Sequence, residues 1–223
     1  MKTLLVFWFH LLFSVNTTVQ DTSVKYYEND PHDFFSLPEV NSPIDVYHPN
    51  YELLDAAVFH ATNLERIKAN VAPFLFDSSL YNAAVKHTES MVKYDFLAHD
   101  NPFESENSDI FGRIERYTKR FYNIAENIQD CFVLDPPRGY CVARKMENEY
   151  QFYDCETYKP VPMLSYKEFA KACLKSWMNS SHHRHNILNQ RYSHLACVGR
   201  IMPNPFSKSS GPYARLTQDF GGQ

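Results

Sequence analysis

Apolar side chains recur every three or four positions in two stretches of the first half of the chain, which is typical of helices that bury one face. The first stretch lies within residues 51–67 and ends before Pro73. The second follows Asp77 or Ser78, either of which suits a helix N-cap, and runs to about Tyr94. We predict a helix in each stretch and a third, shorter one at about residues 109–120. The stripes consist of Leu53, Leu54, Ala57, Val58, Ala61, Leu64 and Ile67 in the first helix, and Leu80, Ala83, Ala84, His87 and Met91 in the second.

The second half of the chain has one strong helix signal followed by strand-like segments. Ser165 and Glu168 have the spacing of a capping box, in which each side chain satisfies a backbone amide at the start of a helix. The helix that they begin is predicted to end at about Asn179. Strand patterns occur at residues 122–128 (a strand or a turn), 195–202 and 213–220. Since helices gather early and strands late, we predict the α+β class and not an alternating α/β fold.

A short apolar run near the N-terminus predicts the compartment. Residues 4–15 follow Lys2 and are almost entirely apolar, a length too short to cross a bilayer but suited to the core of a signal peptide. A buried helix is the alternative, which the polar residues directly after the run make less favourable. We therefore predict a signal peptide at residues 1–20 and an extracellular, secreted protein. No later segment is apolar for long enough to suggest a transmembrane anchor.

The remainder of the chain divides by composition. Residues 21–50 carry four prolines without a regular period, which indicates an extended N-terminal leader, packed on the domain or tethered to it. Residues 51–223 are predicted to form one domain. Within it, residues 129–164 hold three cysteines and are too irregular for a single helix, so we expect an inserted hairpin or loop.

Composition and charge exclude several function classes. Hydrophobic residues make up 44% and charged residues 22% of the 223 residues, the proportions of a globular protein. The formal net charge is −4, so the chain lacks the broad basic surface that nucleic-acid binding needs. There are six glycines and no glycine-rich phosphate-binding motif, which argues against nucleotide chemistry.

The five cysteines suit an oxidising compartment, although their number is odd. Three of them, Cys131, Cys141 and Cys155, crowd the predicted insertion, where we expect at least one disulfide. Cys173 is expected either to pack in the core or to form a bridge to Cys197, and we favour the bridge. No CxxC pair is present, which argues against a zinc ribbon or a redox motif. Asn179 begins a glycosylation sequon, which requires an exposed turn.

Three segments contain residues able to carry chemistry. His99 follows the second predicted helix and precedes Asp100; Glu126 is bracketed by apolar residues; and residues 177–188 combine Ser180 with a histidine-rich run that includes His183. Taken singly, each has a structural explanation as a surface histidine, a hydrogen-bonding strand end or a solvated turn.

Together and in this order, the segments resemble the CAP superfamily of SCP-domain proteins, which includes cysteine-rich secretory, antigen 5 and pathogenesis-related proteins, and specifically its compact bacterial-type branch. This resemblance implies a three-layer α-β-α sandwich with a central, mainly antiparallel sheet and a cleft in which histidine and glutamate side chains meet. It assigns His99 to the first cleft histidine and Glu126 to the first glutamate. The matching motifs are Asn63-x-x-Arg66, Phe96-x-x-His99, Phe111-x-Arg113-Ile114, Ala125-Glu126-Asn127-Ile128, Trp177-x-x-Ser180-x-x-His183-Arg184-x-Asn186-Ile187-Leu188 and Thr217-Gln218-x-Phe220.

The chain departs from the family pattern in ways that affect this cleft. Ser180 stands where the family usually has its second glutamate, and Arg215 where it has its second histidine, so His183 is the available substitute. We expect His99 and Glu126 to be neighbours, His183 to lie on the far lip, and Arg215 to pair with Glu126. If Arg215 instead points to solvent, His99 and His183 are candidate ligands for Zn²⁺ with Glu126 orienting His99.

Two functions are open, and the ligands of the first are those that the family resemblance implies. The first is a secreted, non-enzymatic binding module whose cleft (His99, Glu126, His183 and Arg215) takes a lipid or sterol-like ligand or an extracellular protein partner, with no cofactor required. The alternative is a hydrolase, either metal-assisted or of the Ser-His-Glu type, built from Ser180, His183, His99 and Glu126. No nucleophile-elbow motif supports the serine, so the sequence leans towards binding.

Overall fold

A computed structural model describes residues 24–134, 140–146, 149–154, 156–203 and 211–223. Its main sheet has the strand order β1 (Leu75–Phe76), β6 (His194–Ile201), β7 (Tyr213–Gly222) and β2 (Asn123–Phe132). The pair β1–β6 is parallel, and the pairs β6–β7 and β7–β2 are antiparallel. The predicted signal peptide lies outside the described residues.

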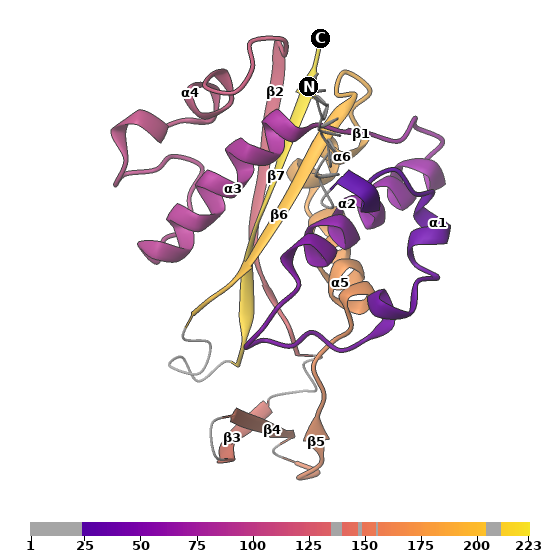
Figure 1. Cartoon of the computed structure of the whole chain (residues 1–223), viewed down its shortest axis with the longest axis vertical. Helices are drawn as coiled ribbons and strands as arrows, with labels where there is room; N and C mark the ends of the chain where they lie inside the picture. The colour runs from indigo at the N-terminus through magenta and orange to yellow at the C-terminus, as the bar shows by residue number, and fades with distance from the viewer. Residues whose placement is uncertain (1–23, 135–139, 147–148, 155, 204–210) are drawn as a thin grey trace, which may run out of the picture.

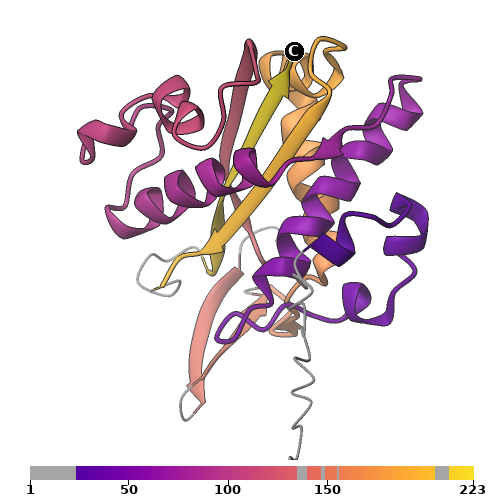
Figure 2. The same ribbon diagram turned by 45° about the horizontal axis from the view of Figure 1, so that its top comes forward.

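Helices cover both faces of this sheet (Figures 1 and 2). One layer contains α2 (Tyr51–Lys68), α5 (Tyr166–Asn179) and α6 (Ser181–Leu188), and the other contains α3 (Ser78–Lys93) and α4 (Ile110–Glu115). Successive residues of β7 point to opposite layers: Gln218 donates to Thr62 of α2, whereas Thr217 accepts from Thr88 of α3. The predicted three-layer α-β-α sandwich with a mainly antiparallel sheet is confirmed.

Local sequence signals fix where the long helices begin. The side chains of Asn50 and Asp77 accept hydrogen bonds from the third residues of α2 and α3, and Ser165 and Glu168 form the expected capping box of α5. The main core lies between α2, α5 and the sheet, where Trp177 is fully buried. A smaller core beneath α3 and α4 contains Leu80, Ala83, Ile114, Phe121 and Ala196.

The N-terminal leader differs from the extended segment that we expected. It contains the short helices η1 (Val24–Tyr26), α1 (Pro31–Phe34) and η2 (Pro38–Asn41). Proline occupies the first turn of α1 and of η2, a position where its missing N–H costs nothing, so these prolines start helices here. Phe34 and Val40 are fully buried, and His60 of α2 lies 2.8 Å from the carbonyl of Tyr26. The leader is therefore part of the packed structure.

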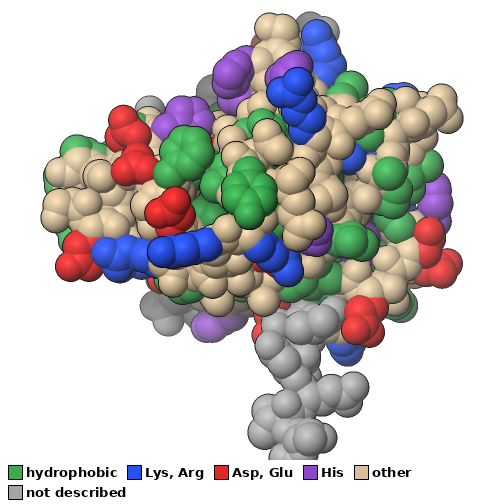
Figure 3. All heavy atoms as spheres, turned by 90° about the horizontal axis from the view of Figure 1, so that it is seen from above, with side chains coloured by type: hydrophobic (Ala, Val, Ile, Leu, Met, Phe, Trp, Pro, Cys, Tyr) green, Lys and Arg blue, Asp and Glu red, His purple; other side chains and the backbone are tan. Residues whose placement is uncertain are grey.

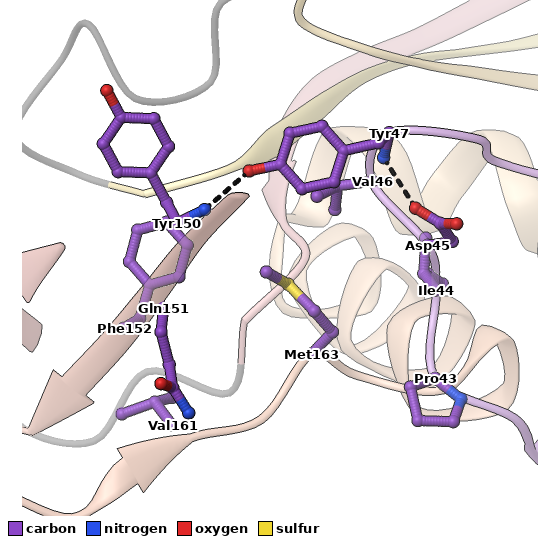
Figure 4. Close-up of a pocket in the computed structure, with 10 residues that line it drawn as sticks. All are labelled: Pro43, Ile44, Asp45, Val46, Tyr47, Tyr150, Gln151, Phe152, Val161 and Met163. Atoms are coloured by element: carbon purple, nitrogen blue, oxygen red, sulfur yellow. Dashed lines mark hydrogen bonds between the residues drawn. The ribbon is translucent and has the colours of Figure 1, made fainter. Parts of the chain in front are cut away.

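The segment after β2 forms a second, three-stranded antiparallel sheet of β3 (Tyr140–Met146), β4 (Glu149–Asp154) and β5 (Pro160–Val161), apart from the main sheet at the bottom of Figure 1. Between this sheet and the leader lies a cavity of about 420 Å³, lined partly by Tyr47, Tyr150 and Met163 (Figure 4). The hydroxyl of Tyr47 accepts a hydrogen bond from the backbone N–H of Tyr150, which joins the leader to β4.

Among the cysteine side chains that the structure describes, Cys131, Cys173 and Cys197 are free thiols. The favoured bridge between Cys173 and Cys197 is not present in the structure. Cys197 lies on the inner strand β6, where its sulfur contacts the amide of Gln218 at 3.5 Å, whereas Cys173 lies on α5 beneath the edge strand β2. The side chains of Cys141 and Cys155 lie outside the described residues, so the expected bridge in the insertion stays a prediction.

Candidate functional site

Glu126 is the centre of the candidate site. It lies on β2, the edge strand of the main sheet, and its side chain is only 2% exposed. Its two carboxylate oxygens have different partners: Oε1 lies 2.7 Å from Nδ1 of His99, and Oε2 accepts from Nη2 of Arg113 at 2.7 Å. Burial alone would raise the pKa of Glu126, but the hydrogen bond from His99 and the charge of Arg113 outweigh it and lower the pKa. Glu126 is thus a buried carboxylate that stays ionised.

His99 is the exposed member of this pair. Its side chain is 50% exposed, and the short contact to Glu126 places the proton on Nδ1, so Nε2 is the ring nitrogen available for a ligand. The hydrogen bond to Glu126 raises the pKa of His99. Its backbone carbonyl accepts from Nη1 of Arg113 at 3.0 Å, so the same guanidinium fixes both partners. The expected contact between His99 and Glu126 is present.

A second histidine, His87 of α3, lies behind the pair and is fully buried. Its Nε2 lies 3.0 Å from the carbonyl of Ala98 and 3.8 Å from Oε2 of Glu126. Burial lowers its pKa to about 4, so it is neutral at physiological pH. His87 therefore positions the loop that carries His99. From the sequence, His87 was placed on the apolar stripe of the second predicted helix. A polar side chain within an apolar stripe was the available signal for a buried hydrogen-bonding role.

Asp219 of β7 is the register partner of Glu126 across the two strands and is also fully buried. Within the described part of the chain, neither of its carboxyl oxygens meets an N–H or hydroxyl donor, and its side chain lies within hydrogen-bonding reach of Glu126. Burial raises the pKa of Asp219 far above its usual range, and the charge of Glu126 raises it further. Asp219 is therefore a neutral acid beside an ionised one. Sequence analysis missed it, although it occupies the variable position of the Thr217-Gln218-x-Phe220 motif.

Arg215 does not take part in this cluster, and the expected ion pair with Glu126 is wrong. Its guanidinium donates to Asp95 at 2.8 Å, to Asp130 at 3.2 Å and to the carbonyl of Met91 at 2.6 Å. The strand register explains the difference, since Arg215 lies opposite Asp130, four residues along β2 from Glu126. That offset corresponds to roughly 13 Å along a strand. The cation that Glu126 needs comes instead from Arg113 on α4.

Ser180 and His183 approach the edge strand from the other helical layer. The Ser180 hydroxyl is the N-cap of α6 and accepts from the backbone N–H of His183 at 3.5 Å. The carbonyl of His183 accepts from Asn127 of β2 at 3.3 Å, and Asn186 donates to the Asn127 side chain at 2.9 Å. This docking orders the histidine-rich run into helix α6, whereas the sequence suggested a turn. His183 is half-buried, and its pKa is lowered by burial and by the charges of His182 and His99.

The site therefore straddles the free edge of β2, with His99 on one side and His183 on the other. Across the described residues, no group of three His, Cys, Asp or Glu side chains is arranged to hold a metal ion. Both oxygens of Glu126 already have partners in His99 and Arg113. Asn179 is exposed at the end of α5, as its predicted glycosylation requires.

Hydrophobic side chains border His99 on its own loop. Leu97 is 44% exposed and Phe103 is 54% exposed, and the Phe103 ring stacks on Tyr94 at 4.8 Å between centroids. Seen from the α4 and α6 end, the surface shows histidine side chains beside large hydrophobic ones (Figure 3). A ligand that touches His99 would thus also meet apolar surface.

Comparisons with known proteins identify the family of the chain. Residues 59–198 match the model of the cysteine-rich secretory protein (CAP) family. An extracellular SCP-domain protein from Bacillus anthracis superposes with a TM-score of 0.50 at 20% identity, covering 78% of this chain and 41% of that one. A cysteine-rich secretory protein from Staphylococcus aureus gives a TM-score of 0.45 at 16% identity, covering 78% of this chain and 40% of its own.

An outer surface protein from Borrelia burgdorferi gives a TM-score of 0.46 at 11% identity, covering 74% of this chain and 90% of that one. The chain thus spans about 40% of the length of two of these three solved structures. A search of curated proteins found no match. Within the described residues, no helix has the length and apolar character needed to cross a membrane.

Proposed function

We propose that this chain, which belongs to the cysteine-rich secretory protein (CAP) family, is an extracellular binding module and that the surface around His99 at the edge of β2 takes an amphiphilic, lipid-type ligand. The ligand would place an anionic head group, a carboxylate or a phosphate, against Nε2 of His99. Its apolar part would lie on Leu97 and Phe103. His183 would border the ligand from the α6 side.

The geometry of His99 carries this proposal. Its imidazole is half-exposed and is oriented by a buried carboxylate, and the pKa shift favours the protonated form. A protonated imidazole is a hydrogen-bond donor suited to an anion. Exposed apolar side chains two residues before it and four residues after it supply the surface that a hydrocarbon chain needs.

Hydrolysis is the second candidate, and the contacts of the site favour it less. A serine nucleophile needs a base within hydrogen-bond reach, but the Ser180 hydroxyl accepts a hydrogen bond from the backbone N–H of His183, which it caps. Glu126 is held by Arg113 and His99 at the same time, so it is positioned to orient an imidazole and not to attack a substrate.

Binding is tested by calorimetry on the mature protein with a long-chain fatty acid, a lysophosphatidic acid and an uncharged sterol as probes. We expect the two anionic amphiphiles to bind and His99→Gln to weaken them about 10-fold or more, the value of one charge-assisted hydrogen bond. Phe103→Ala should weaken them as well. His185→Gln, at an exposed histidine on α6, is the matched control and should leave binding unchanged.

Two outcomes would overturn the proposal. Equal affinities of His99→Gln and the wild type would show that His99 does not contact the ligand. Preferential binding of the sterol, or binding of a protein partner only, would contradict the proposal that the ligand carries an anionic head group. Ester hydrolysis that is lost in Ser180→Ala would establish the alternative function.

A further inference from the structure

Cys131 and Cys173 face each other across the interface between β2 and α5. Even-numbered residues of β2, such as Glu126, face α3 and α4, so odd-numbered ones face the opposite layer. Gln129 shows this directly, since its Nε2 donates to the backbone carbonyl of Cys173 at 3.0 Å. Cys131 is the next residue of β2 on the same face, and it packs against the hydrophobic cluster that contains Cys173.

The two thiols differ in their access to solvent. Cys131 is half-buried and lines a cavity of about 370 Å³ together with Phe132, Leu164 and Lys171. Cys173 is fully buried, and burial together with the neighbouring Cys131 thiol raises its pKa. A reagent in the cavity therefore meets Cys131 first, and Cys173 is the thiol behind it.

Cys197 is not a competing partner. It is fully buried on β6, and its sulfur contacts the amide of Gln218.

We propose that Cys131 and Cys173 are a disulfide-forming pair that ties β2 to α5. The Cys131 thiolate attacks the disulfide of an oxidised thiol–disulfide reagent, such as glutathione disulfide or a protein dithiol oxidant, and releases one thiolate of that reagent. The Cys173 sulfur, after losing its proton, then attacks Cys131 in the mixed disulfide and releases the second thiolate. The protein loses two protons and two electrons, and the reagent disulfide is reduced to two thiols.

This bond would join the two elements that lead to the candidate site. β2 carries Glu126, and α5 leads directly into Ser180 and α6. It would also close a loop over residues 132–172, which contain the second sheet. Formation of this disulfide in the organism rests on the extracellular location proposed above, whereas its formation in vitro does not. A failure of ligand binding and a failure of this proposal are therefore distinguishable.

The test is oxidation of the full mature chain with glutathione disulfide, followed by non-reducing peptide mapping and thermal unfolding. We expect a peptide linked through Cys131 and Cys173, and Cys197 alkylated only after denaturation. Closing a loop of this length should raise Tm of the oxidised protein by about 5–10 °C over the reduced one. Cys131→Ala should abolish both the linked peptide and the shift, and Cys197→Ala should retain both.

The proposal is wrong if Cys173 is recovered alkylated after oxidation, or if Cys131 is found linked to Cys141 or Cys155. It is also wrong if the oxidised Cys131→Ala variant shows the same rise in Tm as the wild type.

Discussion

Arg113 should be the residue on which the stability of the site depends most strongly. Its side chain is 1% exposed and donates hydrogen bonds to the Glu126 carboxylate and to the carbonyls of His99 and Asn107. Replacing it with leucine leaves a buried carboxylate without its guanidinium. Breaking a buried pair in this way costs about 3–5 kcal/mol of unfolding free energy.

The pH dependence of this loss distinguishes charge from packing. In the wild type the folded-state pKa of Glu126 is lowered, so its stabilising contribution is present above the ordinary glutamate pKa and lost as pH falls through the lowered one. In Arg113→Leu, burial is no longer offset by the guanidinium, and we expect the folded-state pKa to rise above the ordinary value. The difference in unfolding free energy between the wild type and Arg113→Leu should then be greatest near neutral pH, and it should shrink as pH falls through the raised pKa of Glu126.

Urea unfolding of both proteins at pH 7.5 and pH 5 measures this difference. Arg116→Leu is the matched control, since Arg116 ends the same helix but pairs with Glu106 at the surface, where an ion pair contributes about 0–1 kcal/mol. Adding Glu126→Gln to Arg113→Leu should recover part of the loss by removing the unpaired charge. A loss below about 1 kcal/mol at pH 7.5, or one that grows at pH 5, would refute the assignment of Arg113 as the partner of a buried carboxylate.

Three further predictions follow from the structure and the sequence. Calorimetry should find no tight Zn²⁺ binding in the wild type or in Arg215→His, because position 215 lies opposite Asp130 and away from Glu126; micromolar binding that His99→Ala abolishes would contradict this. Gly222→Ala should lower the unfolding free energy by about 1–3 kcal/mol, because a Cβ there would clash with the backbone carbonyl oxygen of Arg191. Gly112→Ala is the control, since a Cβ there would make only ordinary contacts from 3.5 Å, and equal losses in the two variants would count against the clash. Mass spectrometry of protein secreted by its native cells should find an N-terminus within about residues 17–20, and recovery of intact Met1 would exclude signal cleavage.

Elements set by local signals were predictable from the sequence. The apolar stripes and N-caps of α2, α3 and α5 are local features of the sequence. The approximate bounds of these helices could therefore be derived without knowledge of tertiary contacts. The leader was misjudged because its prolines occupy helix starts, a choice that depends on burial of Phe34 and Val40 against the domain. Likewise, the packing of α6 against β2 through Asn127 and Asn186 is what orders the histidine-rich run.

The site was predictable only in part, for a related reason. The motif order identified His99 and Glu126, but which cation reaches Glu126 depends on strand register and on how α4 packs. Matching Arg215 to a family histidine placed it at the site, whereas the register places Asp219 there. Arg113 appeared among the matching motifs, but nothing in its local sequence revealed a contact 13 residues along the chain.

The charges of the site explain why it should favour an anion over a metal ion. Two buried carboxyls, Glu126 and Asp219, occupy one register position, and like charges so close together cannot both ionise. Arg113 and His99 hydrogen-bond Glu126 and stabilise its charge, so the proton stays on Asp219. The ionised Glu126 is then balanced by Arg113, and His87 is neutral. The net charge of the cluster is therefore set by His99 alone: zero when it is neutral and positive when it is protonated. Its raised pKa, to which the charge of the neighbouring Asp100 also contributes, extends the positive state towards neutral pH, and a protonated His99 attracts a carboxylate or phosphate more readily than Zn²⁺.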